Sequence, residues 1–189
     1  QAVYGQYAIT LNIPQAPISW LYDDEGMETY DYDLEKAAEL LKEAGWEKDG
    51  DKLMKDGKQM KIVFSAMSGN VVTDTMIPLM IDAYGQLGID FQAEYVDWPT
   101  LQSKSQNGTF DMMFMAWGLT ADPDLTGTFA SAEAGGTQNR TGYANPELDK
   151  MLAEALASTS QDEQKENTKR FTNLSMKNFH YIRSTRDAT

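Results

Sequence analysis

TFDMMFMAWGLTADPD occupies residues 109–124, and this stretch decides the fold. Residues 110–117 are almost unbroken apolar sequence, which is typical of a strand buried on both faces. Gly118 then ends the strand, and Asp122-Pro123-Asp124 turns the chain. The strand alternation places Phe110, Met112, Phe114 and Ala116 on one face, and Met113, Met115 and Trp117 on the other. The pattern therefore predicts a glycine backbone, an indole and two carboxylates at the carboxyl end of a strand, where ligands of open α/β sheets bind.

The composition excludes several classes of function. The chain has 189 residues, and its 16 Lys and Arg against 29 Asp and Glu give a formal charge of −13. Such a surface repels phosphate backbones, so we expect no nucleic-acid partner. The chain has no cysteine, which excludes thiol catalysis and cysteine-based metal sites. Because His180 is the single histidine and no glycine-rich nucleotide motif is present, we expect no metal and no cofactor.

Helix and strand patterns alternate around the organising stretch. Helices are predicted over residues 32–45, 73–87 and 97–107, and from residues 145 and 160 onward. Strands are predicted over residues 61–66 and 89–96, and an exposed turn or small hairpin over residues 47–58. Asp33, Asn145 and Ser160 are the expected N-caps. The strand–helix–strand order predicts parallel strands joined by a right-handed crossover. Pro78 should kink its helix or mark a later start.

These elements predict one α/β domain, a mixed or parallel sheet flanked by helices. Residues 1–30 are expected to form an extended leading segment, residues 31–179 the α/β body, and residues 180–189 a polar tail. Trp20 and Tyr22 in the leading segment have two interpretations. They either pin the segment to the body or contact a ligand.

The two carboxylates of the organising stretch, Asp122 and Asp124, also have more than one interpretation. Asp-Pro-Asp is common turn chemistry. The same side chains are candidates for ligand binding, for metal ligation, or for a carboxylate pair of the kind that glycosidases use, although their spacing is not specific for that chemistry. His180 has no G-x-S-x-G nucleophile elbow to serve as a base.

A series of short motifs runs along the chain in order. They are Tyr32-Asp33 with Glu35-Lys36-Ala37, Ala44-Gly45-Trp46, Lys55-Asp56-Gly57-Lys58, Leu87-Gly88-Ile89, Val96-Asp97-Trp98, Gly108-Thr109-Phe110-Asp111, Ala116-Trp117-Gly118, Ala121-Asp122-Pro123-Asp124, and Thr141-Gly142-Tyr143-Ala144-Asn145-Pro146-Glu147-Leu148-Asp149. In this order they resemble the C-terminal lobe of the oligopeptide, dipeptide and nickel type of extracellular solute-binding proteins of ABC importers. The resemblance runs from Pro14 to Phe179.

The resemblance implies one lobe of a periplasmic-binding-protein-like clamp that closes over a peptide and catalyses nothing. It implies that Ala116, Trp117 and Gly118 pair with the peptide backbone as an added strand. It also implies that Asp122, with Asp124 as a possible substitute, meets the α-ammonium of the peptide. Tyr143 completes the predicted ligand-binding residues.

The resemblance also implies partners and a location. We expect a peptide ligand, an N-terminal lobe absent from this chain, and an ABC permease at the membrane. We expect an extracellular or periplasmic protein, anchored as a bacterial lipoprotein in its full-length form, from which this chain is an excised lobe. Two alternatives stay open: a binder of another solute on the same scaffold (a nickel chelate, haem or an oligosaccharide), and a carboxylate-dependent hydrolase.

Overall fold

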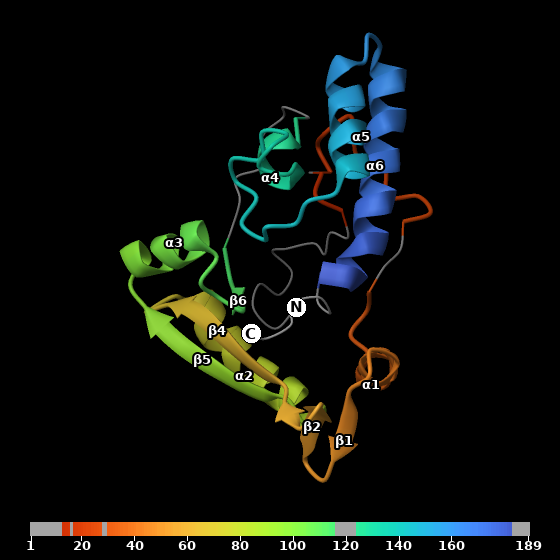
Figure 1. Ribbon diagram of the computed structural model, residues 1–189. Coiled ribbons are helices and arrows are strands. Elements are labelled where there is room, and N and C mark those ends of the chain that lie inside the picture. The colour runs from red at the N-terminus through yellow and green to blue at the C-terminus, as the bar shows by residue number, and fades with distance from the viewer. Residues whose placement is uncertain (1–12, 16, 28–29, 116–123, 183–189) are drawn as a thin grey trace. The chain divides into compact units, whose positions relative to one another are not determined.

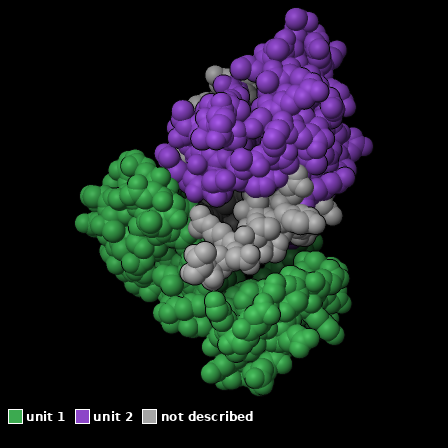
Figure 2. Space-filling model, in the orientation of Figure 1, with its two compact units in different colours: residues 1–9, 31–116 green, residues 10–30, 117–189 purple. Residues whose placement is uncertain are grey.

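The chain forms two compact units (Figures 1 and 2). The computed structural model describes residues 13–15, 17–27, 30–115 and 124–182, with side chains up to Lys177. Unit 1 comprises residues 1–9 and 31–116, and unit 2 comprises residues 10–30 and 117–189. Two compact units can together make one lobe, so they do not test the predicted division into a leading segment, a body and a tail. That division stays a prediction. In the described part of the chain, no helix is both long and apolar enough to cross a membrane.

Unit 1 is built on a parallel sheet. Its strands are β4 (Lys61–Met67), β5 (Asp90–Val96) and β6 (Met112–Met113), in the order β5-β4-β6. Both pairs are parallel, and helix α2 (Val71–Gln86) connects β4 to β5, as predicted from the sequence. Helix α2 begins at Val71, where Asn70 caps it, and continues through Pro78. Of the two outcomes expected at Pro78, a kink or a later helix start, the later start is therefore wrong.

The strand predicted over residues 110–117 is much shorter in the structure. Strand β6 has two residues, both only half-buried, so burial on both faces is wrong for the described part. The reason is the position of β6, which lies at an edge of the described sheet with β4 as the one described strand beside it. Just before β6, the Asp111 carboxylate accepts a hydrogen bond from Val63 N at 2.9 Å and takes the place of a strand partner. The predicted alternation holds for Met112 and Phe114, which pack against one core cluster.

Helices cover both faces of this sheet. On one face, Phe64, Ala66, Phe91 and the α2 residue Ile77 form a buried cluster. On the other face lies Glu94, which is paired in register with Ser65 of β4. Its carboxylate binds Lys104 Nζ of helix α3 (Trp98–Asn107) at 2.8 Å and accepts from Ser65 Oγ at 3.1 Å. The helix predicted over residues 97–107 is confirmed, with Pro99 in its first turn, and Asp97 caps it by accepting from Thr100 N.

The Glu94 ion pair gives unit 1 an expected pH dependence. The hydrogen bond from Lys104, and then that from Ser65, lower the pKa of Glu94. A carboxylate whose pKa is lower in the folded state stabilises the fold above its unfolded pKa of about 4.3, and this stabilisation is lost as the pH falls through the folded pKa. We therefore expect the stability difference between the wild type and Glu94→Gln to be full at pH 7 and to shrink progressively below about pH 4.3.

Urea unfolding at a series of pH values measures this difference. The matched control is Glu47→Gln, because Glu47 is an exposed carboxylate of the same unit with no ion pair among the described residues. A difference between wild type and Glu94→Gln that stays constant from pH 7 to pH 3 would show that the ion pair does not stabilise the fold.

The segment predicted as an exposed turn or small hairpin is a three-stranded antiparallel meander. It consists of β1 (Glu47–Asp49), β2 (Lys52–Lys55) and β3 (Lys58–Gln59). Its anchor is Gly88, after the end of α2, whose carbonyl oxygen accepts from Leu53 N at 2.7 Å. Because Leu53 is buried and Gly88 lies directly against the backbone of β2, the meander is fixed to the turn between α2 and β5.

Helix α1 (Leu34–Glu43) begins where the sequence predicts. Asp33 caps it by accepting from Lys36 N at 2.9 Å, and Gly45 has the left-handed φ of 84° that terminates it. The spacing of its apolar residues is that of a buried face, but no residue of α1 is buried and Ala38 is exposed. The helix contributes no residue to either core cluster, and this explains the difference.

Unit 2 is helical. Its elements are α4 (Thr126–Phe129), α5 (Pro146–Ala157) and α6 (Gln161–Ile182). Asn145 caps α5 and Pro146 opens it, as predicted. At α6, Ser160 Oγ accepts from Glu163 N as a capping box requires, but Glu163 accepts from Thr159 N instead of Ser160 N. The core of this unit consists of Ala130, Leu148, Leu152 and Phe171.

The described residues of the leading segment belong to unit 2 and pack within it. Ile13, Leu21 and Met27 are its buried apolar residues, whereas Trp20 is 41% exposed. Asp23 binds Lys169 Nζ of α6 at 3.1 Å, and this hydrogen bond lowers the pKa of Asp23. The anchoring role expected of Trp20 is therefore carried mainly by these smaller apolar residues and by the ion pair.

Candidate functional site

The predicted site falls where the sequence passes from unit 1 into unit 2, after residue 116. Ala116, Trp117, Gly118 and Asp122 lie outside the described residues. Their roles stay predictions. We call residues 116–123, which contain these four residues, the predicted segment. The structure describes strand β6 before the predicted segment, helix α4 after it, and the positions of Asp124 and Tyr143.

Strand β6 leads into the segment at the carboxyl edge of the sheet. It runs parallel to β4, with Met112 opposite Phe64 and Met113 opposite Ser65. Strands β4 and β5 end at this same edge, where Ser68 N and Oγ donate to Val96 O at 2.9 and 3.2 Å. Parallel strands of α/β proteins place ligands at this edge. Among the described residues, β6 pairs with β4 alone. The other side of β6 is therefore the position where an extended ligand could add as a strand.

Two aromatic side chains at this carboxyl edge were not singled out as site residues from the sequence. Tyr95, near the end of β5, is 52% exposed, and Trp98, at the start of α3, is 49% exposed. Exposed rings of this size are candidates for contact with apolar groups of a ligand. The signal that could have found Trp98 is its place in the motif Val96-Asp97-Trp98, directly after a predicted strand.

Asp124 comes directly after the segment and opens unit 2. It is exposed, and its Oδ1 accepts from Thr126 N at 2.8 Å, which is the turn interaction that one interpretation of the sequence predicted. Asp124 also borders a hollow that Leu152, Phe171 and neighbouring residues of α5 and α6 line. The hollow measures about 10 Å³, which is about the space that one water molecule needs. A peptide does not fit there, so ligand binding by Asp124 would have to take place outside the hollow.

Tyr143 has structural contacts. It is half-buried and packs against the core cluster of unit 2. Its hydroxyl accepts from Asn145 Nδ2 at 3.1 Å, and its carbonyl oxygen accepts from Asn139 Nδ2 at 2.8 Å. These bonds hold the ring and the backbone in place, and the ring is not among the residues that line the hollow beside Asp124.

The loop between α4 and α5 is held tightly on α4. Gln138 N donates to Gly127 O at 2.7 Å, and Asn139 Nδ2 donates to Ala130 O at 2.9 Å. Asp149 of α5 accepts from Ser131 N at 2.8 Å and from Ser131 Oγ at 2.6 Å. Asp149 therefore fixes the start of this loop, a role that the sequence motif ending in Leu148-Asp149 did not reveal.

The described residues offer no metal centre: none of their His, Asp and Glu side chains gather in a group of three or more that could hold an ion. The arrangement that they do form is a sheet edge with exposed aromatic rings in unit 1, and a rigid, hydrogen-bonded loop next to an exposed carboxylate in unit 2. Both are suited to contacts with a ligand, and the predicted segment joins them along the chain.

Comparison with known proteins gives consistent matches. Residues 1–140 match the model of the bacterial extracellular solute-binding proteins, family 5. The chain is 32% identical over 148 residues to the oligopeptide-binding protein AppA of Bacillus subtilis, covering 76% of this chain and 27% of AppA. It is 28% identical over 163 residues to the nickel-binding periplasmic protein of Escherichia coli, covering 82% of this chain and 30% of that protein.

A solved structure agrees with these matches. The structure of B. subtilis AppA in complex with a nonapeptide superposes with a TM-score of 0.81 at 25% identity, over 90% of this chain and 35% of the AppA chain. This likeness confirms the predicted α/β fold of the periplasmic-binding-protein kind. The chain spans 27–30% of the length of the curated oligopeptide-binding and nickel-binding relatives.

Proposed function

The chain belongs to the bacterial extracellular solute-binding proteins of family 5, and on that basis we propose that it is part of a substrate-binding component of an ABC importer that captures oligopeptides outside the cell. The observation that carries this proposal is the 32% identity to an oligopeptide-binding protein over 148 residues. The ligand, the second lobe and the permease are parts of the same proposal, as is a lipoprotein anchor in the full-length protein.

The geometry of the carboxyl edge supports a peptide as the ligand. A peptide backbone that pairs with the chain at Ala116–Gly118 gains main-chain hydrogen bonds independently of its side chains. A carboxylate just beyond the pairing segment complements the α-ammonium of a peptide, because charge-assisted hydrogen bonds are about twice as strong as neutral ones. In this proposal Asp122 is the carboxylate, and Asp124 contributes to the negative potential of the same turn.

Replacement of Asp122 tests the proposal. In the protein produced from the complete reading frame, Asp122→Ala should weaken binding of penta-alanine with a free amino terminus by about ten- to a hundredfold, the loss expected for a hydrogen bond to a charged group. The N-acetylated peptide should bind the wild type and the variant equally, because it lacks the ammonium. Isothermal titration calorimetry measures all four affinities.

Asp51→Ala is the matched control, because Asp51 is an exposed carboxylate in the turn between β1 and β2. It removes the same charge and should leave binding of both peptides within twofold of the wild type. Equal binding of the free peptide by wild type and Asp122→Ala would contradict the Asp122 assignment, whereas failure of the wild type to bind any peptide would contradict the proposed function.

A second candidate is a related binder of a metal chelate, which the 28% identity to a nickel-binding relative supports. Native mass spectrometry of the full-length protein separates the two candidates, because a peptide and a nickel complex differ in mass and isotope pattern. Both are binding functions, and we propose that the protein carries out no catalysis. Hydrolysis of a peptide library that Asp122→Asn and Asp124→Asn together abolish would contradict this.

A further inference from the structure

Arg140 is a half-buried cation that has no partner among the described residues. Most Lys and Arg side chains that are half-buried in the described part of the chain bind an acid or a carbonyl oxygen, as Lys55, Lys104 and Lys169 do. Arg140 is half-buried too, yet within the described ranges no carboxylate lies within 4.0 Å of its guanidinium, which donates no hydrogen bond to another described residue. Although the chain has 29 acidic residues, none of those that the structure describes pairs with this arginine.

The backbone on both sides of Arg140 is fixed. Asn139 donates through Nδ2 to Ala130 O and to Tyr143 O, at 2.9 and 2.8 Å. Its Oδ1 accepts from Thr141 N at 3.2 Å and from Thr141 Oγ1 at 2.8 Å. Arg140 thus projects from a turn whose flanking residues are held by four hydrogen bonds. A cation held in this way loses less freedom on binding an anion than one on a mobile loop.

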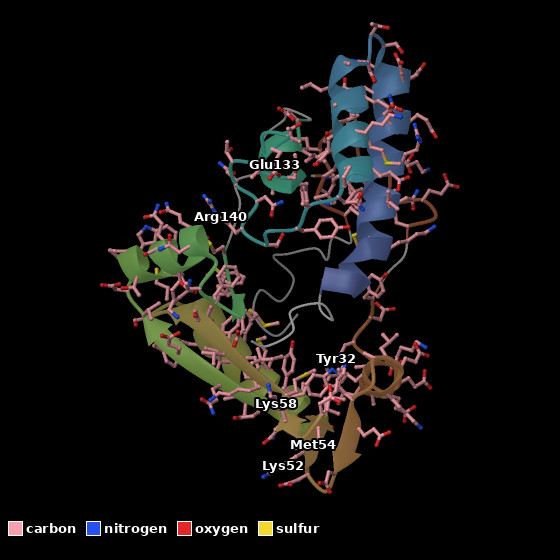
Figure 3. The ribbon with its side chains drawn as sticks, in the orientation of Figure 1. Tyr32, Lys52, Met54, Lys58, Glu133 and Arg140 are labelled. Atoms are coloured by element: carbon pink, nitrogen blue, oxygen red, sulfur yellow. The ribbon has the colours of Figure 1, made fainter. Side chains whose placement is uncertain are left out.

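The turn lies against helix α4, which comes after the predicted binding segment in the chain. Gln138 N donates to Gly127 O in the first turn of α4, and Asp124 accepts from Thr126 N at the start of the same helix. Figure 3 shows Arg140 on the loop beside α4, away from the pair formed by α5 and α6. Arg140 is therefore attached to the same short helix that the predicted segment leads into.

We propose that Arg140 binds a carboxylate of the peptide ligand, and that it makes the protein selective for peptides that carry this group. Guanidinium is suited to this role because its planar fork pairs with a carboxylate through two parallel hydrogen bonds. A partly buried charge without a partner is costly, and a ligand that supplies the counter-charge removes that cost. This inference rests on the proposed peptide-binding function.

The carboxylate has two possible sources, the C-terminus of the peptide and an acidic side chain. Calorimetry with the protein from the complete reading frame distinguishes them through four probes: penta-alanine, its C-terminal amide, the amide with a central Glu, and the amide with a central Gln. If the C-terminus is the source, only penta-alanine should bind tightly. If a side chain is the source, the amide with Glu should bind more tightly than the amide with Gln.

Arg140→Gln should weaken binding of the preferred carboxylate-bearing probe about ten- to a hundredfold, and should change binding of its carboxylate-free counterpart by less than twofold. Arg140→Lys should bind at an intermediate level, because it keeps the charge and loses the fork. Lys177→Gln is the matched control: Lys177 is an exposed cation of unit 2 without an ion pair among the described residues, so the same charge change should leave all affinities within twofold.

Two results would overturn the assignment of Arg140. One is an equal loss for carboxylate-bearing and carboxylate-free probes in Arg140→Gln; the other is no loss for either. In both cases the wild type still binds peptide, so the proposed function stands. If the wild type binds none of the four probes, the peptide-binding function and the role of Arg140 both fail.

Discussion

Gly88→Ala should lower the free energy of unfolding by roughly 2–5 kcal/mol, because two costs add. Gly88 has a φ of 83°, a left-handed conformation that costs a residue with a side chain about 1–2 kcal/mol. An added Cβ would also lie 2.8 Å from Leu53 N and 2.9 Å from Lys52 C. These are backbone atoms, so the meander has to move away, and the hydrogen bond from Leu53 N to Gly88 O is strained or lost.

Gly85→Ala is the matched control, three residues earlier in the chain. Gly85 lies in the last turn of α2, and an added Cβ meets no atom within 4 Å. Alanine should therefore stabilise the chain there, by roughly 0.5–1 kcal/mol at most, because it costs less entropy in a helix than glycine. Urea unfolding of both variants checks the opposite signs. A loss below about 1 kcal/mol for Gly88→Ala would mean that β2 does not lie against this turn.

The elements that the sequence predicts well are those set by neighbouring residues. Asp33 and Asn145 cap their helices because a short polar side chain reaches the backbone N–H groups two or three residues later. Such signals are complete within four residues. The parallel pairing of β4 and β5 also results from local order, because a strand, a helix and a strand in short succession pair in parallel.

The length of β6 could not be predicted, because it depends on distant groups. Apolar residues continue past Met113, but the pairing stops after two residues. Directly before β6, the Asp111 carboxylate accepts the hydrogen bond from Val63 N, which lies 48 positions away in the sequence. The same limit applies to α1, whose apolar spacing is that of a buried face although the fold brings no core against it.

The candidate site was predicted as a segment, and its supporting residues were not. The motif from Thr141 to Asp149 signalled a helix start through Asn145 and Pro146, which are local features. The contact of Asp149 with Ser131 spans 18 positions, and nothing in the spacing indicates it. That Arg140 has no partner among the described residues is likewise a property of the fold, since 29 acids in the sequence make a partner appear available.

Phe171→Ala should lower the free energy of unfolding by about 3–5 kcal/mol, the range for removing a fully buried aromatic ring. The side chain is 0% exposed and lies in the core cluster of unit 2 with Leu148 and Leu152. Its ring meets that of Phe129 edge to face, with centroids 5.8 Å apart. Phe129 ends α4, so loss of the ring also loosens the helix on which the loop carrying Arg140 rests.

Leu156→Ala is the control for Phe171→Ala. Leu156 lines the same hollow from α5 but is 59% exposed, so its truncation should change stability by no more than about 0.5 kcal/mol. Phe171→Leu keeps most of the volume and should cost less than about 1.5 kcal/mol, which makes the test informative even if the alanine variant does not fold. Thermal and urea unfolding measure all three. Equal losses for Phe171→Ala and Leu156→Ala would mean that Phe171 is not the centre of this core, and that α4 is held by the hydrogen bonds of its loop instead.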